Sequence, residues 1–201
     1  WELERRGLKF CRYADDCNVY VKSEKAAERV LASLTRYVEE VLKLRVNRDK
    51  SGTFRPCDSV FLGYSFSRGN YSRIVVAKKP FKRLKNKLRH IFRTARGTSL
   101  KTTIQRLTPI LRGWRQYFKL DERKRVFEEL DAHIRRHLRK LIWIAWKNPK
   151  TRERNLLKRG LPPFNAWKSS VNGRGKWWNA GAPHMNIAWT GSRNHRTASI
   201  S

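Results

Sequence analysis

Apolar side chains recur at helical spacing through residues 81–146, and this periodicity constrains the fold more than any other feature of the sequence. The first stretch has one apolar face, formed by Phe81, Leu84, Leu88, Ile91 and Phe92. Two further stretches follow over 100–120, where Pro109 is expected to bend or restart the helix, and over 122–146. Because an apolar stripe on a helix is stable only when another element covers it, the pattern predicts a small bundle of three helices.

The first 78 residues have a different pattern, in which short runs of β-branched and aromatic residues surround one helical segment. Strands are predicted over 9–13, 17–22, 59–66 and 73–77. An amphipathic helix is predicted over 24–43, packed on a core, with Ser23 as its N-cap, and Gly69–Asn70 is a turn signal. Strands and helices in this order indicate an α+β fold.

Charge separates the chain into two parts. The formal net charge is +31, with 16 basic and 10 acidic residues in 1–78 against 31 basic and 6 acidic residues in 79–201. So large an excess predicts a polyanionic partner, nucleic acid before a membrane surface. No apolar run is long enough to span a bilayer, and no signal peptide is seen. The three cysteines, at 11, 17 and 57, suggest reduced thiols and a cytoplasmic setting without a zinc site.

Prolines, glycines and tryptophans interrupt all periodicity after residue 147. The sequence therefore predicts an irregular, basic extension over 148–201 that becomes ordered on a partner, with its last ten residues disordered. The domain organisation predicted from these patterns is 1–78, 79–147 and 148–201.

Asp15 and Asp16 stand side by side between the first two predicted strands, within "FCRYADDCNVYV". A turn that presents carboxylate oxygens suits a hard cation such as Mg²⁺, and a pair of such ions supports displacement at phosphorus. Aspartate is also common in turns for conformational reasons alone, so the two letters by themselves leave both interpretations open.

The surrounding motifs resemble those of a known family. "YADD" at 13–16 resembles the YxDD box of reverse transcriptases, and "LRVNRDKS" at 44–51 and "FLGYSF" at 61–66 follow it in the order typical of that family. "LTPILRGWRQYFKL" at 107–120 resembles the thumb and maturase segment of group II intron-encoded proteins. "WKNPKTRERNLLKRGL" and "NAGAPHMN" near the C-terminus are similar to bacterial members, particularly those without an endonuclease domain.

The resemblance implies the end of a reverse-transcriptase palm, made of antiparallel strands plus a helix, followed by a basic helical thumb or maturase bundle, domain X. It implies that Asp15 is the principal ligand and Asp16 a supporting ligand for two Mg²⁺ ions, shared with an aspartate upstream of this chain. Tyr13, Ala14 and Gly63 are expected beside the primer terminus and the incoming dNTP. Lys50 is expected to donate a proton to pyrophosphate or simply to contact phosphate.

The implied activity is RNA-directed DNA synthesis by a group II intron protein that also binds its intron RNA and assists splicing. Since the chain begins without methionine shortly before the acidic pair, we expect it to be the C-terminal piece of a longer protein, inactive as a polymerase by itself. The alternative is a non-catalytic, RNA-binding splicing cofactor. The bound intron, the choice between splicing and mobility, and the oligomeric state are left open.

The expected RNA contacts are basic residues of the helices and the extension. They are Lys82, Arg83, Lys87, Arg112, Arg115, Arg135, Arg136, Arg139, Arg174 and Lys176. Among the aromatic residues, Trp114, Tyr117 and Phe118 share a helical face and are expected to pack in the bundle. His133 and His137 are expected to be polar neighbours or RNA contacts rather than metal ligands. For Trp177 and Trp178, packing and base stacking remain equal alternatives.

Overall fold

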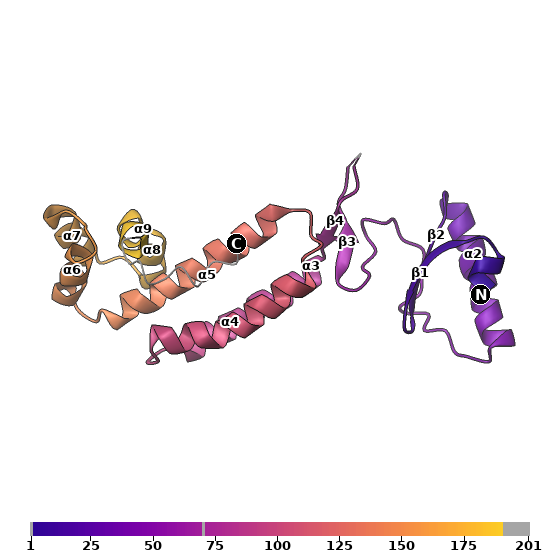
Figure 1. Ribbon diagram of the computed structural model, residues 1–201, viewed down its shortest axis with the longest axis horizontal. Helices are drawn as coiled ribbons and strands as arrows, with labels where there is room; N and C mark the ends of the chain where they lie inside the picture. Colours follow the sequence, from indigo (N-terminus) through magenta and orange to yellow (C-terminus); the bar gives the residue numbers. More distant parts are fainter. Residues whose placement is uncertain (1, 70, 191–201) are drawn as a thin grey trace. The chain divides into compact units, whose positions relative to one another are not determined.

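Short strands and helices form the N-terminal part of the chain. The computed structural model describes residues 2–69 and 71–190, and it divides into two compact units, 1–77 and 78–201. The elements of the first unit are α1 (Glu2–Arg5), β1 (Lys9–Tyr13), β2 (Asp16–Tyr20), α2 (Glu24–Arg36), the π-helical turn η1 (Tyr37–Val41), β3 (Tyr64–Phe66) and β4 (Ile74–Val76) (Figure 1). β1 pairs with β2 and β3 with β4, both antiparallel and in separate sheets.

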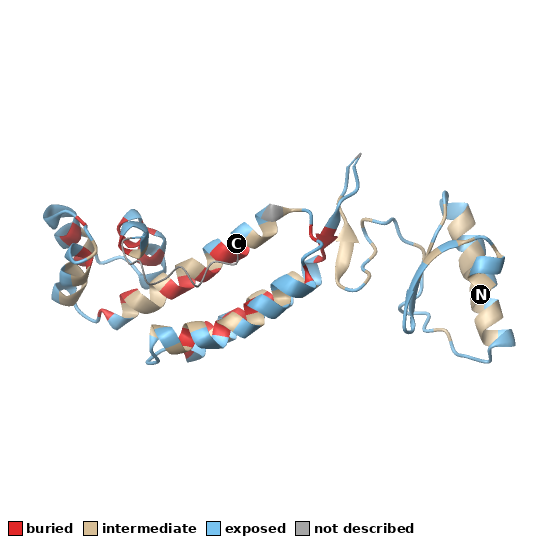
Figure 2. Ribbon diagram, in the orientation of Figure 1, coloured by how far each residue is buried: buried red, intermediate tan, exposed pale blue. Residues whose placement is uncertain are grey.

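The predicted helix over 24–43 is present but ends differently. Ser23 caps α2, where its Oγ accepts a hydrogen bond from the amide of Ala26 at 3.3 Å. The α-helix then passes into the π-helical turn η1, a change of hydrogen-bond period that the apolar spacing does not encode. The expected core under this helix is not seen in this unit, because none of the described residues up to 74 is buried (Figure 2).

The predicted strand over 59–66 is mostly wrong, since only Tyr64–Phe66 is a strand. Phe61 and Tyr64 exchange two backbone hydrogen bonds of 2.9 Å around Leu62 and Gly63, both with positive φ, of 51° and 79°. This tight turn interrupts the run, and glycine suits it because a left-handed backbone costs glycine little. Asn70, half of the predicted turn signal, lies outside the described residues.

Helices alone form the described part of the second unit. They are α3 (Lys78–Thr94), α4 (Leu100–Tyr117), α5 (Lys124–Ala145), α6 (Pro149–Leu157), α7 (Pro163–Ser170), α8 (Lys176–Gly181) and α9 (Pro183–Thr190). The predicted three-helix bundle is confirmed: one core cluster joins Leu84, Leu88, Phe92, Leu107, Leu111, Leu130, Ile134 and Leu138 from α3, α4 and α5. α4 continues through Pro109 without restarting, because Leu107 and Leu111 pack in this core on either side of it.

The predicted irregular extension is wrong for residues 148–190, which form α6 to α9. The prolines stand at helix starts, Pro149 and Pro163 in first turns and Pro183 at the first residue of α9. There the missing N–H costs nothing and the fixed φ favours the helix. A second core cluster joins α6, α7 and α9 to the end of α5, through Trp143, Trp146, Leu156, Leu161, Ala166, Met185 and Ala188 (Figure 2). The prediction for the last ten residues falls outside the described part.

The fold class is thus α+β, mostly helical, with two small antiparallel sheets. The extension does not stand apart from the helical bundle, since α8 packs along α5 in the same unit.

Candidate functional site

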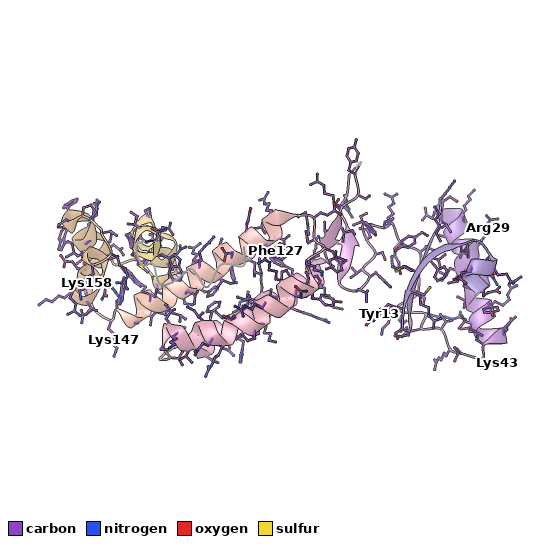
Figure 3. The ribbon with its side chains drawn as sticks, viewed as in Figure 1. Tyr13, Arg29, Lys43, Phe127, Lys147 and Lys158 are labelled. Carbon is purple, nitrogen blue, oxygen red and sulfur yellow. The ribbon has the colours of Figure 1, made fainter. Side chains whose placement is uncertain are left out.

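The acidic pair lies at the tip of the β1–β2 hairpin. Tyr13 pairs with Asp16 at the end of the ladder, so the turn consists of Ala14 and Asp15 alone. Ala14 takes a left-handed φ of 53°, and its carbonyl accepts a hydrogen bond from Arg12 Nε at 3.0 Å. Both carboxylates are exposed, and so is Tyr13, which lies at the same end of the hairpin (Figure 3). Asp16 belongs to β2 rather than to the turn.

The two exposed carboxylates offer the oxygen donors that Mg²⁺ prefers, but two carboxylates are fewer ligands than a Mg²⁺ site needs. Across residues 2–69 and 71–190, no group of three or more His, Cys, Asp or Glu side chains is placed to hold a metal ion. The donors of Asp15 and Asp16 therefore fit one part of a Mg²⁺ site and do not complete it.

Lys50 and Gly63, the other predicted polymerase residues, lie in local turns. Lys50 is exposed, and its amide donates to the carbonyl of Asn47 at 3.2 Å. Gly63 belongs to the tight turn after Phe61, where its carbonyl accepts a hydrogen bond from the amide of Ala77 at 2.9 Å. Gly63 thus has a local structural reason, its place in the tight turn. The predicted roles of Gly63 beside the primer and of Lys50 toward pyrophosphate stay predictions.

A flank of α3 carries the densest line of positive charge. Lys78, Lys82, Lys85, Arg89 and Arg93 succeed one another at intervals of three or four residues, so they lie along one side of the helix. Arg96 follows just after the helix ends. The predicted residues Arg83 and Lys87 are also exposed, but their spacing places them on the opposite flank.

This line of charge continues onto α5. Burial, together with the nearby charges of Lys85 and Arg89, lowers the pKa of His133. Burial likewise lowers the pKa of Lys140, and the charges of Arg96 and Lys176 add to the effect. Lys140 of α5 is therefore close enough to Arg96 and to Lys176 of α8 for their charges to repel, while Lys85 and Arg89 of α3 lie near His133. We call Lys85, Arg89, Arg96, Lys140 and Lys176 the basic face.

His137 lies buried beside the basic face. Its ring stacks on Phe92 with centroids 4.4 Å apart and meets the rings of His133 and Trp177 at 4.6 and 4.8 Å. Burial first, and then the charges of His133, Lys140 and Arg89, lower its pKa to about 4. At neutral pH His137 is thus uncharged, and its ring packs against residues of α3 and α8.

Two of the predicted RNA contacts on α5 hold α8 in place. Arg136 lies 4.3 Å from the centre of the Trp177 ring, and its Nη2 donates to the Trp177 carbonyl at 3.2 Å. Arg139 Nε donates to the carbonyl of Ala180 at 2.8 Å. A methyl group at Gly181 would lie 2.9 Å from Arg136 Cζ, so a larger residue there would make the guanidinium shift. These contacts give both arginines a structural role, and their binding of RNA stays a prediction.

The remaining predicted basic residues lie on several surfaces. Arg112 and Arg115 are exposed on α4. Arg135 pairs with Asp131 one turn earlier on α5. Arg174 stacks on Trp178, with 4.1 Å between its Cζ and the ring centre. They therefore do not gather at one place, and Lys176 alone of the predicted C-terminal pair belongs to the basic face.

The aromatic predictions hold in part. Trp114 contacts Phe81, Phe118 and Phe127, and Phe118 is buried, so these residues pack in the bundle as expected. Tyr117 does not, since it is 56% exposed at the end of α4. Trp177 and Trp178 each pack against an arginine and keep 40% and 44% of their surface exposed, so packing is seen and base stacking stays a prediction.

Sequence reasoning omitted four residues of the basic face from the predicted site. Lys85 and Arg89 carry a local signal, the helical repeat of basic residues that begins at Lys78. Arg96 and Lys140 have none, since only the packing of α3 and α8 against α5 brings them together.

One part of the chain matches a known protein family. Residues 70–160 match the family model described as the group II intron, maturase-specific domain. The chain contains a group II intron maturase domain. The matched residues include α3 to α6, and thus four of the five residues of the basic face. No curated protein matches the chain in a sequence search. Within residues 2–69 and 71–190, none of the helices has an apolar stretch of membrane-spanning length.

Proposed function

We propose that this chain binds group II intron RNA through the basic face, most of which lies in the maturase domain, and thereby assists splicing. The observation that carries the proposal is that Arg96 and Lys176 lie near Lys140, and Lys85 and Arg89 near His133, where burial and then repulsion by these charges lower the pKa of both groups. A phosphate backbone placed there removes this repulsion and releases counterions. The family of the matched domain supports intron RNA as the polyanion.

Salt dependence tests the binding. If the five side chains of the basic face each neutralise one phosphate, log K against log salt concentration has a slope of about −4. The experiment measures filter binding of a group II intron RNA to the chain across a series of salt concentrations. An affinity that is independent of salt would contradict the proposal.

Assistance to splicing needs its own measurement. We expect the chain to accelerate splicing of a group II precursor RNA at Mg²⁺ concentrations where the RNA alone splices slowly, because bound protein stabilises the folded RNA. Binding without any acceleration would leave an RNA-binding protein that is not a splicing cofactor.

We also propose that the hairpin tip contributes to the metal site of an RNA-directed DNA polymerase that uses primer DNA and dNTP. Support comes from the exposure of Asp15 and Asp16 at a tight turn and from the YADD motif. When bound, Mg²⁺ would activate the primer hydroxyl and stabilise the leaving group. The residues of this chain would supply two carboxylates to hold it, while Lys50 would contact phosphate.

Paramagnetic broadening by Mn²⁺ tests the metal site. We expect Mn²⁺ to broaden NMR signals of residues 13–16 selectively, with loss of the effect in Asp15→Asn, Asp16→Asn. Because the described residues do not complete a metal site, we expect no template-dependent primer extension by the chain alone. Primer extension by the chain with Mg²⁺ would overturn that expectation. If Mn²⁺ did not broaden the signals of residues 13–16 selectively, the proposed metal site would be overturned.

A further inference from the structure

Trp177 presents a large aromatic ring at the edge of the basic face instead of burying it. Arg136 lies over the ring at 4.3 Å, His137 meets it at 4.8 Å and Lys140 Nζ is 5.9 Å from its centre. The residue nevertheless remains 40% exposed. An exposed aromatic ring offers a face on which a nucleic-acid base can stack, and nearby cations attract the phosphates that flank such a base.

The ring is held in position before any ligand arrives. Arg136 fixes the backbone of Trp177 through its carbonyl, and Arg139 fixes α8 through the carbonyl of Ala180. Asn179, which is fully buried, donates to the carbonyl of Arg174 at 2.8 Å and accepts from the side chain of Asn172 at 2.8 Å. Because the turn before α8 is thus tied to the helix, little conformational freedom remains to be lost on binding.

The positive charge beside the ring matches a nucleotide that stacks there. Lys140 is close to the ring, and Arg96 and Lys176 are close to Lys140. Phosphates on either side of a stacked base would meet these three cations. In a duplex both faces of each internal base are covered by its neighbours, so only an unpaired or terminal base offers a face to the ring.

We propose that Trp177 is a stacking platform for an unpaired base of the bound RNA, with Lys140 and Lys176 placed for its flanking phosphates. The inference rests on the proposed RNA binding and adds to it a preference for single-stranded segments. Arg136 acts as the positioning residue, since it lies over the ring and donates to the Trp177 carbonyl.

The test uses the full chain and a short single-stranded RNA that carries 2-aminopurine, a base whose fluorescence falls when it stacks. We expect fluorescence quenching on binding to wild-type protein. Trp177→Leu keeps apolar bulk but removes the ring, and we expect it to weaken binding of this probe roughly fivefold or more and to abolish the quenching. Trp177→Phe keeps a ring and should retain most of both.

Trp167→Leu is the matched control. Trp167 is 52% exposed and contacts Phe164 on α7, a helix that packs against α6 and α9, so this variant should bind as wild type. The inference would be overturned if wild-type protein bound the RNA without quenching its fluorescence, or if Trp177→Leu bound it as tightly as wild type. It would also be overturned if Trp167→Leu lost as much affinity as Trp177→Leu. If Trp177→Leu does not fold, the wild-type quenching and Trp177→Phe decide the question.

A fully paired RNA duplex separates this inference from the proposed function. We expect duplex binding to fall with salt and to be equal in wild type and Trp177→Leu. Salt-dependent duplex binding without quenching of the single-stranded probe would overturn the platform and leave the basic face in place. Failure to bind either RNA would overturn both.

Discussion

Arg136 is the residue whose removal most directly tests how α8 is attached to α5. Arg136→Leu deletes a cation over the Trp177 ring, worth about 1 kcal/mol at a half-buried site, and a hydrogen bond from a charged donor, worth about 1.5 kcal/mol. Leucine restores some apolar contact, so we expect the free energy needed to detach α8 from α5 to fall by about 2 kcal/mol. That decrease raises the population of molecules with α8 detached roughly 30-fold.

Amide hydrogen exchange measures this opening. The amides of Asn179 and Ala182, bonded to the carbonyls of Gly175 and Asn179 at 3.1 Å, should exchange faster in Arg136→Leu, while amides of α3 should not. Arg115→Leu, at an exposed arginine on α4, is the control and should leave α8 unchanged. Unaltered exchange in α8, or equal acceleration in all helices, would refute this account of the contact.

Three further predictions concern stability. Leu138→Ala removes a side chain with no exposed surface from the three-helix core and should cost about 3 kcal/mol in the free energy of unfolding by urea, whereas a loss under 1 kcal/mol would contradict the packing. Gly63→Ala forces a residue with a Cβ into φ of 79° and should cost about 1 kcal/mol in the same assay; no loss would mean that the turn is not held. The pKa of His137 falls from its usual 6.5 to about 4 in the folded chain, so the unfolded chain binds the proton more tightly. The resulting stability is fully present above pH 6.5 and is lost as pH falls toward 4, with a loss on the order of 2 kcal/mol that His137→Gln should abolish; a pH profile that is the same in both proteins would refute it.

The three-helix core was predictable because its signal is local. Residues such as Leu84, Leu88 and Phe92 recur at the spacing of one helix face, and that face is buried. Ser23 likewise acts within a single turn, through the amide of Ala26. In both cases the residues that determine the structure are near neighbours in the sequence.

The C-terminal helices were not predictable from composition, because a proline has opposite meanings inside a helix and at its start. Asn148 accepts a hydrogen bond from the amide of Thr151 at 2.8 Å, so that Pro149 falls in the first turn of α6. Read with its capping asparagine, this proline indicates a helix start rather than a break.

The kind of ligand at the candidate site was predictable from the sequence, but the residues that form the site were not. Excess charge after residue 78 indicated a polyanion, but the contact between Arg136 and Trp177 joins positions 41 residues apart. No local pattern distinguishes an arginine that anchors a helix from one that faces solvent. For the same reason, the grouping of Arg96 with Lys140 emerges only from the packed helices.

The salt dependence of RNA binding by two matched triple variants tests the central claim most directly. The first variant neutralises three members of the basic face by Lys85→Gln, Arg89→Gln and Lys140→Gln. The control variant neutralises three exposed residues of α6 and its C-terminal end, Lys150, Arg154 and Lys158. The account predicts that the slope of log K against log salt becomes less negative by about 2 to 3 in the first variant and by less than about 1 in the control. Equal changes in the two variants, or an unchanged slope in the first, would contradict RNA binding at the basic face.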